Sequence, residues 1–560
     1  MIQQPTIRSR GRPVLWVLLV LLAVALLANR RTPSADTSRW LSTKWTKWTK
    51  HRSDRSIEWI TTPDDPRTHP VKALHQQAVR KFEALIARQS KTLEAAVSEY
   101  KHRWSRNPPS GFEDWFAFAK QQNSTVIDEF NMISEAMQPL WSLRPQQIHQ
   151  MVEEAASGPD IWTLEFKDGV VITPKDNWMG LEMGAFLGDL LTKIPNLKIL
   201  NNPMDEPRVL VSSDQPPDHV QWSDGSMRPA WKAISAPCNS KAKYTKLRTT
   251  FPKAHGMTFV TNLDAASDVC QNPSFKGIHG FFMAPTTFVT TDSPVPILSQ
   301  AAPSTFLDII HPSTWYWDDG STDSTDWDYD WDNKTNKLYW AGGTTGGWNL
   351  PLHRNQRTWH SQRHRFIDMT HQLTPGQSYG YLGQNAAGEW VRYDSKDFQS
   401  ELYDTRFTGT AQCDEPVCAE MEEYYHIEGK VDERRAYNFR LIIDIDGNSF
   451  SGRYHRFLAS KSCVLKQTVF REWHDERLVP WLHYVPISTG MEELPEVVRY
   501  LATTEEGQRI AEVIAEKGRE AHDVSLRRVD AVIYMYRLFL EYARMSGEGR
   551  DGGMVSRDGT

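Results

Sequence analysis

The segment LIIDIDGNSFSGRYHRFL, residues 441–458, places acidic, small and basic residues at a spacing that suits either a metal ion or an anion. Asp444 and Asp446 end an apolar run typical of a buried β-strand, and a turn of small polar residues leads to a predicted helix. Ligands of open α/β sheets bind at the carboxyl ends of strands, where a helix N-terminus and guanidinium groups attract phosphate. We therefore favour a phosphate-binding loop formed by Ser451 and Arg453. A cation site at the two aspartates, which would share one face of a strand, and a purely structural turn are the alternatives.

A second anion-binding pattern lies in KLYWAGGTTGGW, residues 337–348. An aromatic strand is predicted to run into a glycine- and threonine-rich loop, whose backbone amides can approach an anion closely. The downstream segment SQRHRF adds positive charge. The candidate anion-binding residues of this region are Gly342, Gly343, Thr344, Thr345, Arg363 and Arg365. Two anion-binding loops in one α/β region predict a nucleotide diphosphate ligand.

Composition limits the class of protein. The chain has 560 residues, which predicts at least two domains, and its net charge of −6 gives no indication of a nucleic-acid partner. Charged residues make up 24% and apolar residues 39%, as in a soluble globular protein. The acidic run at residues 318–332 is typical of a solvated loop, although its carboxylates would also suit a hard cation.

The N-terminus carries the one long apolar segment, VLWVLLVLLAVALLA. It predicts a cytosolic tail at residues 1–13, a signal-anchor transmembrane segment at 14–28 and a stem at 29–65. The apolar segment is short for a membrane span of about 20 residues, so a cleaved signal peptide is the alternative. Basic residues flank it on both sides and do not define its orientation. Asn123 and Asn333 begin N-glycosylation sequons, which favour a lumenal location.

The five cysteines are consistent with two disulfides and one unpaired thiol, as in an oxidising compartment. The disulfide candidates are Cys238, Cys270, Cys413 and Cys418. Cys413 and Cys418 would close the smallest loop. A zinc site is the alternative, but no second matching pair of ligands lies near them.

The pattern of apolar residues predicts the main elements. Residues 71–104 are predicted as one long amphipathic helix. Residues 437–545 alternate strands with helices, which indicates parallel β/α units. The tail at residues 546–560 is predicted to be disordered.

At these motifs the chain resembles glycosyltransferase family 90, the capsule-associated-protein (CAP10-like) glycosyltransferases. It is most similar to their fungal β-xylosyltransferase branch, and Rumi-type protein O-glucosyltransferases are more distant. The similarity runs from about residue 66 to residue 545. It is strongest over DIDGNSFSGRYHRFLASKSCVLK, REWHDERLVPWLHYVPIS and PPSGFEDWFAFAKQQNSTVIDEF.

The resemblance implies a GT-B fold, which is α/β with two Rossmann-like domains and a cleft between them. It implies an N-terminal acceptor and catalytic-base domain at residues 66–310 and a nucleotide-sugar-binding domain at 311–510. Helices at 511–545 would pack back on the N-terminal domain. With the membrane anchor, these are the domains we expect.

The resemblance also implies roles for individual residues. The general base of the family lies in an Asn-x-x-Asp-x-Pro pattern, which here is Asn202 to Pro207 and identifies Asp205. Glu206 is the neighbouring alternative for the general base. The structural alternative is that Asp205 is only a turn residue before Pro207. Such a base would take the proton of the acceptor hydroxyl.

The donor arginine of the family corresponds to Arg453, with Ser451 beside it. Arg363 corresponds to the arginine that follows the Gly/Thr loop. Glu472 could accept a ribose hydroxyl, or could pair with Arg471 or Arg477. Many members have an arginine where this chain has Ala341. Either Arg363 or Arg365 compensates for the missing arginine, or the affinity for the donor or the identity of the donor differs.

The function implied is inverting transfer of a sugar, expected to be xylose, from a UDP-sugar to a hydroxyl of a glycan or glycoconjugate of the capsule or cell-wall type. No metal or other cofactor would be required. The enzyme would be a single-pass type II protein of the Golgi or ER membrane. The alternatives are a UDP-glucose-dependent O-glucosyltransferase, a glycoside hydrolase using Asp205 and Glu206 or another carboxylate pair, and a catalytically silent glycan-binding membrane protein, which Ala341 favours.

Overall fold

A computed structural model describes residues 65–174, 176–213, 217, 219–239, 253–317, 328–351 and 359–547, all within one compact unit of the chain. The predicted cytosolic tail, anchor and most of the stem lie outside these residues, as do residues 318–327 of the acidic run and most of the predicted disordered tail. Among the described residues, no helix combines the length and the apolar character that a membrane span needs.

The N-terminal helix predicted over residues 71–104 is two helices, so this prediction is wrong. They are α3 (Pro70–Ala87) and α4 (Leu93–Trp104). The side chain of Thr92 accepts a bond from the backbone N–H of Ala95 and starts the second helix as an N-cap. Between the helices, the Gln89 side chain accepts from the backbone N–H groups of Ile127 and Asp128. The break is therefore held by contacts with a distant segment.

A mixed five-stranded sheet follows the N-terminal helices, with the strand order β2-β1-β3-β8-β9. Its strands are β1 (Trp162–Lys167), β2 (Val170–Ile172), β3 (Leu197–Asn201), β8 (Ile297–Ser299) and β9 (Ile309–Ile310). β3, β8 and β9 are parallel, whereas β1 is antiparallel to both of its neighbours. The helices before and within this region are α5 (Phe112–Gln121), α6 (Asn131–Met137), α7 (Pro145–Ala155) and α8 (Trp178–Leu187).

A second five-stranded sheet, with the order β13-β10-β14-β15-β16, is entirely parallel. Its strands are β10 (Thr335–Gly342), β13 (Tyr403–Phe407), β14 (Phe439–Ile445), β15 (Cys463–Gln467) and β16 (Val485–Ile487). β14 is almost wholly buried, as its continuous apolar run predicted. Because all five strands are parallel, their carboxyl ends lie along one edge of the sheet, and the Gly/Thr loop and the 446–453 turn both leave from that edge.

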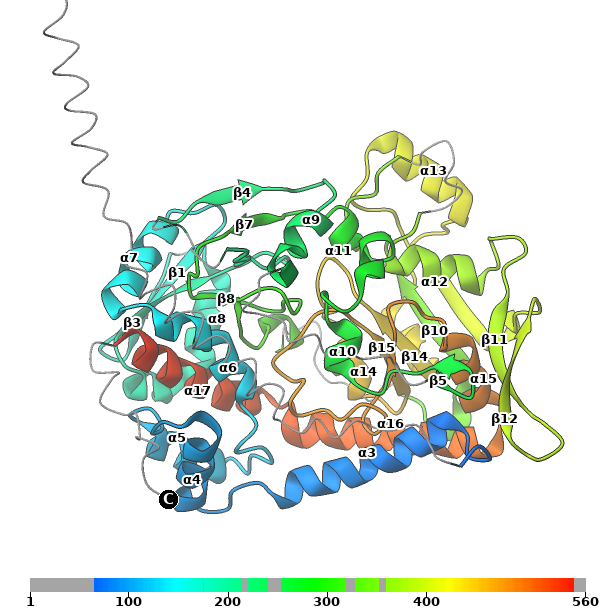
Figure 1. Ribbon diagram of the computed structural model, residues 1–560, viewed down its shortest axis with the longest axis horizontal. Helices are drawn as coiled ribbons and strands as arrows, with labels where there is room; N and C mark the ends of the chain where they lie inside the picture. Colours follow the sequence, from blue (N-terminus) through cyan, green and yellow to red (C-terminus); the bar gives the residue numbers. More distant parts are fainter. Residues whose placement is uncertain are drawn as a thin grey trace, which may run out of the picture. The chain divides into compact units, whose positions relative to one another are not determined.

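The helices of the C-terminal half are α12 (Gln362–Thr370), α13 (Glu415–Tyr425), α14 (Tyr454–Leu458), α15 (Leu494–Thr503), α16 (Glu505–Ser525) and α17 (Arg528–Ser546). α16 lies beside α3, and α17 turns back to α5, α6, α7 and α8 of the N-terminal half (Figure 1). The indole N–H of Trp115 in α5 donates to the carbonyl oxygen of Ile533 in α17 at 3.0 Å. The C-terminal helix thus packs against the N-terminal helices.

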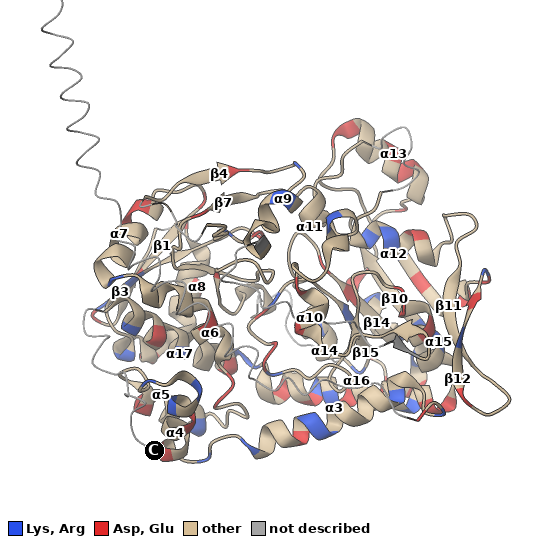
Figure 2. Ribbon diagram, viewed as in Figure 1, with Lys and Arg blue, Asp and Glu red and all other residues tan. Residues whose placement is uncertain are grey.

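The smaller elements connect these layers. They are β4 (Trp222–Asp224), β5 (Lys253–Ala254), β6 (Met257–Thr258), β7 (Val289–Thr291), β11 (Tyr379–Gln384), β12 (Trp390–Ser395), α9 (Trp231–Ile234), α10 (Leu263–Ser267) and α11 (Gly280–Met283). Acidic and basic residues are interspersed along most helices, and α13 carries acidic residues over much of its length (Figure 2).

Two hydrophobic cores pack against the sheets, and the first reaches both of them, because it also contains Ile442 and Val464 on one face of the parallel sheet. The first includes Trp115, Ile199 and Phe539, and the second includes Trp340 and Ile443. Burial of apolar area at about 25 cal/mol per Å² makes each sheet, with its helices, a stable layer. The mixed α/β class with parallel strands and helices is confirmed.

Candidate active site

The loop that follows β3 presents Asp205, and Asn202 gives the loop its shape. The Asn202 amide group donates to the Glu206 carbonyl oxygen and to the Ser299 hydroxyl, and its oxygen accepts from Arg208 Nε at 2.9 Å. Asn202 and Arg208 are fully buried, whereas Asp205 is exposed. Asn202 therefore clamps both ends of the loop and leaves the Asp205 carboxyl group open to a ligand.

The neighbouring Glu206 is unavailable as the alternative base. Its carboxylate is buried and accepts four hydrogen bonds, from the backbone N–H and the side-chain hydroxyl of both Thr286 and Thr287. These contacts satisfy the acceptor capacity of a carboxylate. Glu206 thus ties the loop to the segment before β7, and it also acts on its neighbour. Although the residue is exposed, protein atoms around its carboxyl group partly desolvate it. This desolvation and, second, the charge of Glu206 raise the pKa of Asp205 above its usual value, against the opposing effect of a bond from Asn448.

Asn448 joins the two halves of the candidate site. Its amide nitrogen donates to Asp205 Oδ2 at 3.1 Å, and its amide oxygen accepts from the backbone N–H of Gly346 at 3.2 Å. One side chain therefore contacts both the predicted base and the predicted Gly/Thr loop, which lie far apart in the sequence. Sequence reasoning missed Asn448, because it was considered only as a small residue of the turn.

Arg363 fixes the Gly/Thr loop against the end of β14. Its Nη1 donates to the Gly343 carbonyl oxygen and the Thr345 hydroxyl, while Nε and Nη2 donate to the carbonyl oxygens of Asp446 and Ile445. The side chain is buried. Burial and, second, the charge of Arg453 lower the pKa of Arg363 to about 9. Arg363 is a positioning residue for the loop and also a source of positive charge.

Arg453 lies at the same place but has fewer partners. Its Nη1 donates to the carbonyl oxygen of Ala341 at 2.6 Å, and its buried Nη2 has no hydrogen-bond partner. Burial lowers the pKa of its guanidinium group. Within the described part of the chain, no carboxylate lies within ion-pair distance of Arg363 or Arg453. Buried cations without a counterion cost several kcal/mol, and an anionic ligand would offset that cost.

The helix after this turn is shorter than predicted. α14 has only five residues, and Arg453 occupies its N-cap position. So few peptide dipoles add little to anion binding. Guanidinium groups and loop amides, rather than a helix terminus, would hold the phosphates.

Glu472 is buried beneath the turn rather than open to a ligand. Its two oxygens accept from the Tyr316 hydroxyl and from Lys466 Nζ, the latter at 3.2 Å, so the partners of the carboxylate are not the arginines expected from the sequence. The Tyr316 hydroxyl also lies 3.4 Å from the carbonyl oxygen of the buried Ser451. Burial raises the pKa of Glu472 to about 7. Glu472 thus supports the Ser451 turn from behind.

The two aspartates that end β14 are engaged by the protein. Asp444 Oδ2 lies 3.4 Å from Lys466 Nζ, and Asp446 Oδ2 accepts from the Val469 N–H at 2.8 Å and lies 3.2 Å from His279 Nε2. A lysine ammonium beside Asp444 competes with any divalent cation. Over the described ranges, no three acidic, histidine or cysteine residues are grouped as a metal site would need.

Arg365 does not join this cluster. Residues two apart on α12 point to nearly opposite sides, and Arg365 donates to the carbonyl oxygens of Thr489 and Gly490 at 2.8 and 2.6 Å. There it lines a cavity of about 850 Å³ with Asp368 and Tyr379. The structure thus brings together Asp205, the Gly/Thr loop, Arg363, Ser451 and Arg453, and separates Arg365 from them.

Part of the chain matches a known protein family. Residues 284–547 match the family model described as Glycosyl transferase family 90. Over these residues, just under half of its length, the chain is similar to glycosyl transferase family 90. The matched residues include the Gly/Thr loop, Arg363 and Arg453, whereas Asp205 precedes them.

Curated proteins that the chain resembles are O-glucosyltransferases by name. The O-glucosyltransferase rumi homolog of Aedes aegypti is 23% identical over 277 residues, which is 45% of this chain and 56% of the relative. The rumi homolog of Anopheles gambiae is 25% identical over 263 residues, with the same coverage. Protein O-glucosyltransferase 3 of Rattus norvegicus is 30% identical over 108 residues, or 19% of this chain and 21% of the relative. The chain thus spans between about a fifth and just over half of the relatives' length.

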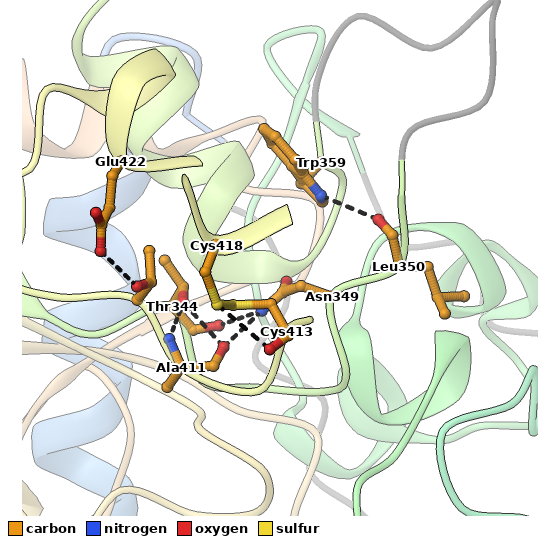
Figure 3. Close-up of a disulfide and its surroundings, with 9 residues drawn as sticks. Thr344, Asn349, Leu350, Trp359, Ala411, Cys413, Cys418 and Glu422 are labelled. Atoms are coloured by element: carbon orange, nitrogen blue, oxygen red, sulfur yellow. Dashed lines mark hydrogen bonds between the residues drawn. A yellow bond between two sulfur atoms is a disulfide. The ribbon is translucent and has the colours of Figure 1, made fainter. Parts of the chain in front are cut away.

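One of the two disulfides supports the Gly/Thr loop. Cys413 is bonded to Cys418, and Cys238 is bonded to Cys270. Next to Cys413, the Ala411 backbone N–H donates to the Thr344 hydroxyl at 2.9 Å, and the Asn349 amide group donates to the carbonyl oxygens of Thr344 and Ala411 (Figure 3). Cys463 is buried and unpaired.

We expect the double substitution Cys413→Ser and Cys418→Ser to weaken UDP binding severalfold. Without the bond, the loop between residues 413 and 418 loses a constraint worth about 2 kcal/mol, and the adjoining segment at Ala411 supports the Gly/Thr loop less firmly. Calorimetric titration with UDP measures the effect. The Cys238→Ser and Cys270→Ser double variant is the control, and an equal loss of affinity in both double variants would contradict the prediction.

Asp475, three residues after Glu472, is expected to give the protein an unusual pH dependence of stability. Burial and the charge of Glu472 raise the pKa of Asp475 to about 8, whereas an aspartate in an unfolded chain has a pKa of about 3.9. Between these values the folded protein binds more protons than the unfolded chain. The contribution of Asp475 to the free energy of unfolding is therefore fully present below the lower value and is lost as pH rises through the upper one.

Asp475→Asn should remove this loss. The asparagine cannot ionise, and its side-chain oxygen can still accept the 3.0 Å bond from the Glu472 N–H. Relative to wild type, the variant should gain up to about 1.4 kcal/mol per pH unit between about pH 4 and pH 8. Denaturant unfolding at several pH values measures the difference. The prediction is wrong if the difference in the free energy of unfolding between the variant and the wild type stays constant or shrinks as pH rises. Asp475 would then ionise in the folded protein without loss of stability.

The remaining predicted sites lie at the surface. Asn123 and Asn333, which begin the two sequons, are not buried. Asn123 follows α5 and has a positive φ of 54°, a conformation that asparagine tolerates.

Proposed function

We propose that this protein is an inverting glycosyltransferase that moves a sugar from a UDP-sugar to a hydroxyl of a glycan. Xylose is the first candidate for the transferred sugar. The observation that carries the proposal is the Asn448 side chain, which hydrogen-bonds both to Asp205 and to the Gly/Thr loop. It keeps a carboxylate beside a loop flanked by two arginines that lack carboxylate partners. The two separate five-stranded sheets, one mixed and one parallel, support a GT-B arrangement.

In the proposed reaction, the acceptor oxygen forms a bond to the anomeric carbon as the bond from that carbon to the UDP oxygen breaks. The acceptor proton passes to Asp205, whose raised pKa makes its carboxylate a stronger base. The negative charge that develops on UDP is stabilised by Arg453, by Arg363 and by loop amides. A single displacement inverts the configuration at the anomeric carbon.

No metal is required in this proposal. Arginine side chains supply the positive charge that a cation would otherwise bring to the diphosphate. The two aspartates at the end of β14 are already bonded to Lys466, His279 and Val469.

We place the enzyme in the lumen of the ER or Golgi, as a single-pass type II protein held by the segment at residues 14–28. Two disulfides are typical of an oxidising compartment. The accessibility of both sequon asparagines supports the same location.

Glucose is the second candidate for the transferred sugar, because the relatives are named O-glucosyltransferases. A glycoside hydrolase is disfavoured, since the engaged Glu206 cannot form a catalytic pair with Asp205 and a hydrolase has no use for a diphosphate site. The test is release of UDP from a panel of UDP-sugars by the purified full-length protein, with and without EDTA. We expect release from UDP-xylose or UDP-glucose that EDTA does not reduce. Absence of UDP binding would refute the proposal.

A further inference from the structure

Two exposed tryptophans lie next to the candidate active site. Trp178 is the first residue of α8, and Trp315 belongs to the short 3-10 helix at Thr314–Trp317. Their side chains are 37% and 46% exposed. The ring centroids are 5.3 Å apart and the ring planes meet at 70°. The two rings form an open corner of apolar surface.

The donor side of the site anchors one of these rings. A Cβ atom built on Gly452 would lie 3.9 Å from the Cβ atom of Trp315. Gly452 stands between Ser451 and Arg453, the predicted phosphate-binding residues. The residue after Trp315 is Tyr316, whose hydroxyl lies against the Ser451 turn. Trp315 therefore lies beside the donor loop, at van der Waals distance from the Cβ position of Gly452.

The base side of the site anchors the other ring. Met179, next to Trp178, accepts a bond at its sulfur from the side chain of Asn201 at 3.5 Å. Asn201 is the last residue of β3 and leads directly into the loop that carries Asp205. The tryptophan pair thus extends from α8, which contacts the strand end that leads into the Asp205 loop, to the turn that carries Arg453. An acceptor must lie between this loop and this turn if Asp205 is to take its proton.

We propose that Trp178 and Trp315 form the acceptor subsite and that its ligand is a pyranose ring of a glycan. This inference rests on the proposed function and adds the class of acceptor to it. A pyranose with equatorial hydroxyls exposes axial C–H bonds that pack on an indole face, while its hydroxyl groups stay at the rim. Two rings at 70° let a sugar stack on one indole and rest its edge on the other.

The apolar surface continues beyond the pair, which defines the competing explanation. Leu181 on α8 and Val170 and Ile172 on β2 are also exposed. A protein partner or a membrane would use these aliphatic side chains as well as the indoles. A sugar would use the indoles and not Leu181, so Leu181→Ala is a matched control on the same helix.

The experiment is calorimetric titration of the UDP-saturated full-length protein with β-linked gluco- and xylo-oligosaccharides and α-linked manno-oligosaccharides. We expect at least one series to bind. Trp178→Ala and Trp315→Ala should each weaken binding of that oligosaccharide about tenfold or more. Trp315→Tyr keeps a stacking surface, so its affinity for the oligosaccharide should stay within about threefold of the wild-type value. Leu181→Ala should bind the sugar as the wild type does, and all variants should bind UDP as the wild type does.

The outcomes separate the two proposals. If the wild type binds UDP but none of the oligosaccharides, or if the alanine variants bind them as tightly as the wild type, the acceptor subsite is overturned and the donor site stands. If Leu181→Ala weakens binding as much as Trp315→Ala, the patch is a general apolar surface, which also overturns the inference. If the wild type does not bind UDP, the proposed function itself fails.

Discussion

Replacing Asp205 with asparagine is expected to abolish sugar transfer while leaving UDP binding intact. The side-chain oxygen of the asparagine could still accept the bond that Asn448 donates to Asp205, so the loop should keep its geometry. The amide cannot take a proton from the acceptor, and loss of a general base costs about 1,000-fold in rate. Measuring kcat with the active UDP-sugar, together with UDP titration, tests both halves of the prediction.

The matched control is the adjacent substitution Glu206→Gln. A glutamine oxygen cannot replace both carboxylate oxygens that bind Thr286 and Thr287, so this variant should lose thermal stability. Asp205→Asn should not, because Asp205 is exposed. The assignment of the base is wrong if Asp205→Asn retains more than about a tenth of wild-type turnover, given the contribution expected of a general base.

The pH profile gives a second reading of the same group. Desolvation and Glu206 raise the pKa of Asp205, so the carboxylate form is lost at a higher pH than for an ordinary aspartate. Turnover of the wild type should therefore fall as pH decreases through this raised pKa. The residual activity of Asp205→Asn should lack that acid limb.

The sequence was informative where structure depends on local pattern. The apolar run of β14 and the glycines after β10 identified both loops at the carboxyl edge of the parallel sheet, because strand burial and loop flexibility are encoded by adjacent residues. The break between α3 and α4 was missed because the apolar periodicity continues through it. Thr92, a good N-cap residue, was the local indication of the break.

Contacts between distant segments could not be predicted in the same way. Asn448 meets Asp205 across 243 positions of sequence, and Tyr316 meets Glu472 across 156. Nothing near these residues in the sequence specifies their partners. The separation of Arg363 from Arg365 is different, because helix geometry alone places residues two apart on opposite sides. The spacing of the two arginines was therefore enough to predict that they point apart.

The network behind the donor loop shows why buried charge near a site can be structural. Lys466 is buried between Asp444 and Glu472, and its side chain lies 3.8 Å from the ring centre of Tyr454. Such a cluster holds the turn at residues 446–453 in place, while the two arginines above it lack carboxylate partners. The charges of Asp444 and Glu472 are thus paired with Lys466. Arg363 and Arg453 therefore remain able to bind an anionic ligand.

Arg453→Ala is expected to weaken UDP binding by about 100-fold, since a charge-assisted bond to phosphate is worth about 1.5 to 3 kcal/mol and its loss also leaves the Ala341 carbonyl oxygen unpaired. Arg453→Lys keeps the charge but not the planar fork, and should recover about a tenth of the wild-type affinity. Calorimetric titration with UDP, at constant ionic strength, measures both.

Arg365→Ala provides the decisive comparison, because this arginine lies on the same helix as Arg363 but donates to Thr489 and Gly490 instead. It should lower thermal stability through two unpaired carbonyl oxygens and leave the affinity for UDP unchanged. If Arg365→Ala weakens UDP binding as much as Arg453→Ala does, the diphosphate lies in the cavity beside Arg365. The cationic loop beside Asp205 would then have a different ligand, and the carboxylate there would have no leaving group to act against.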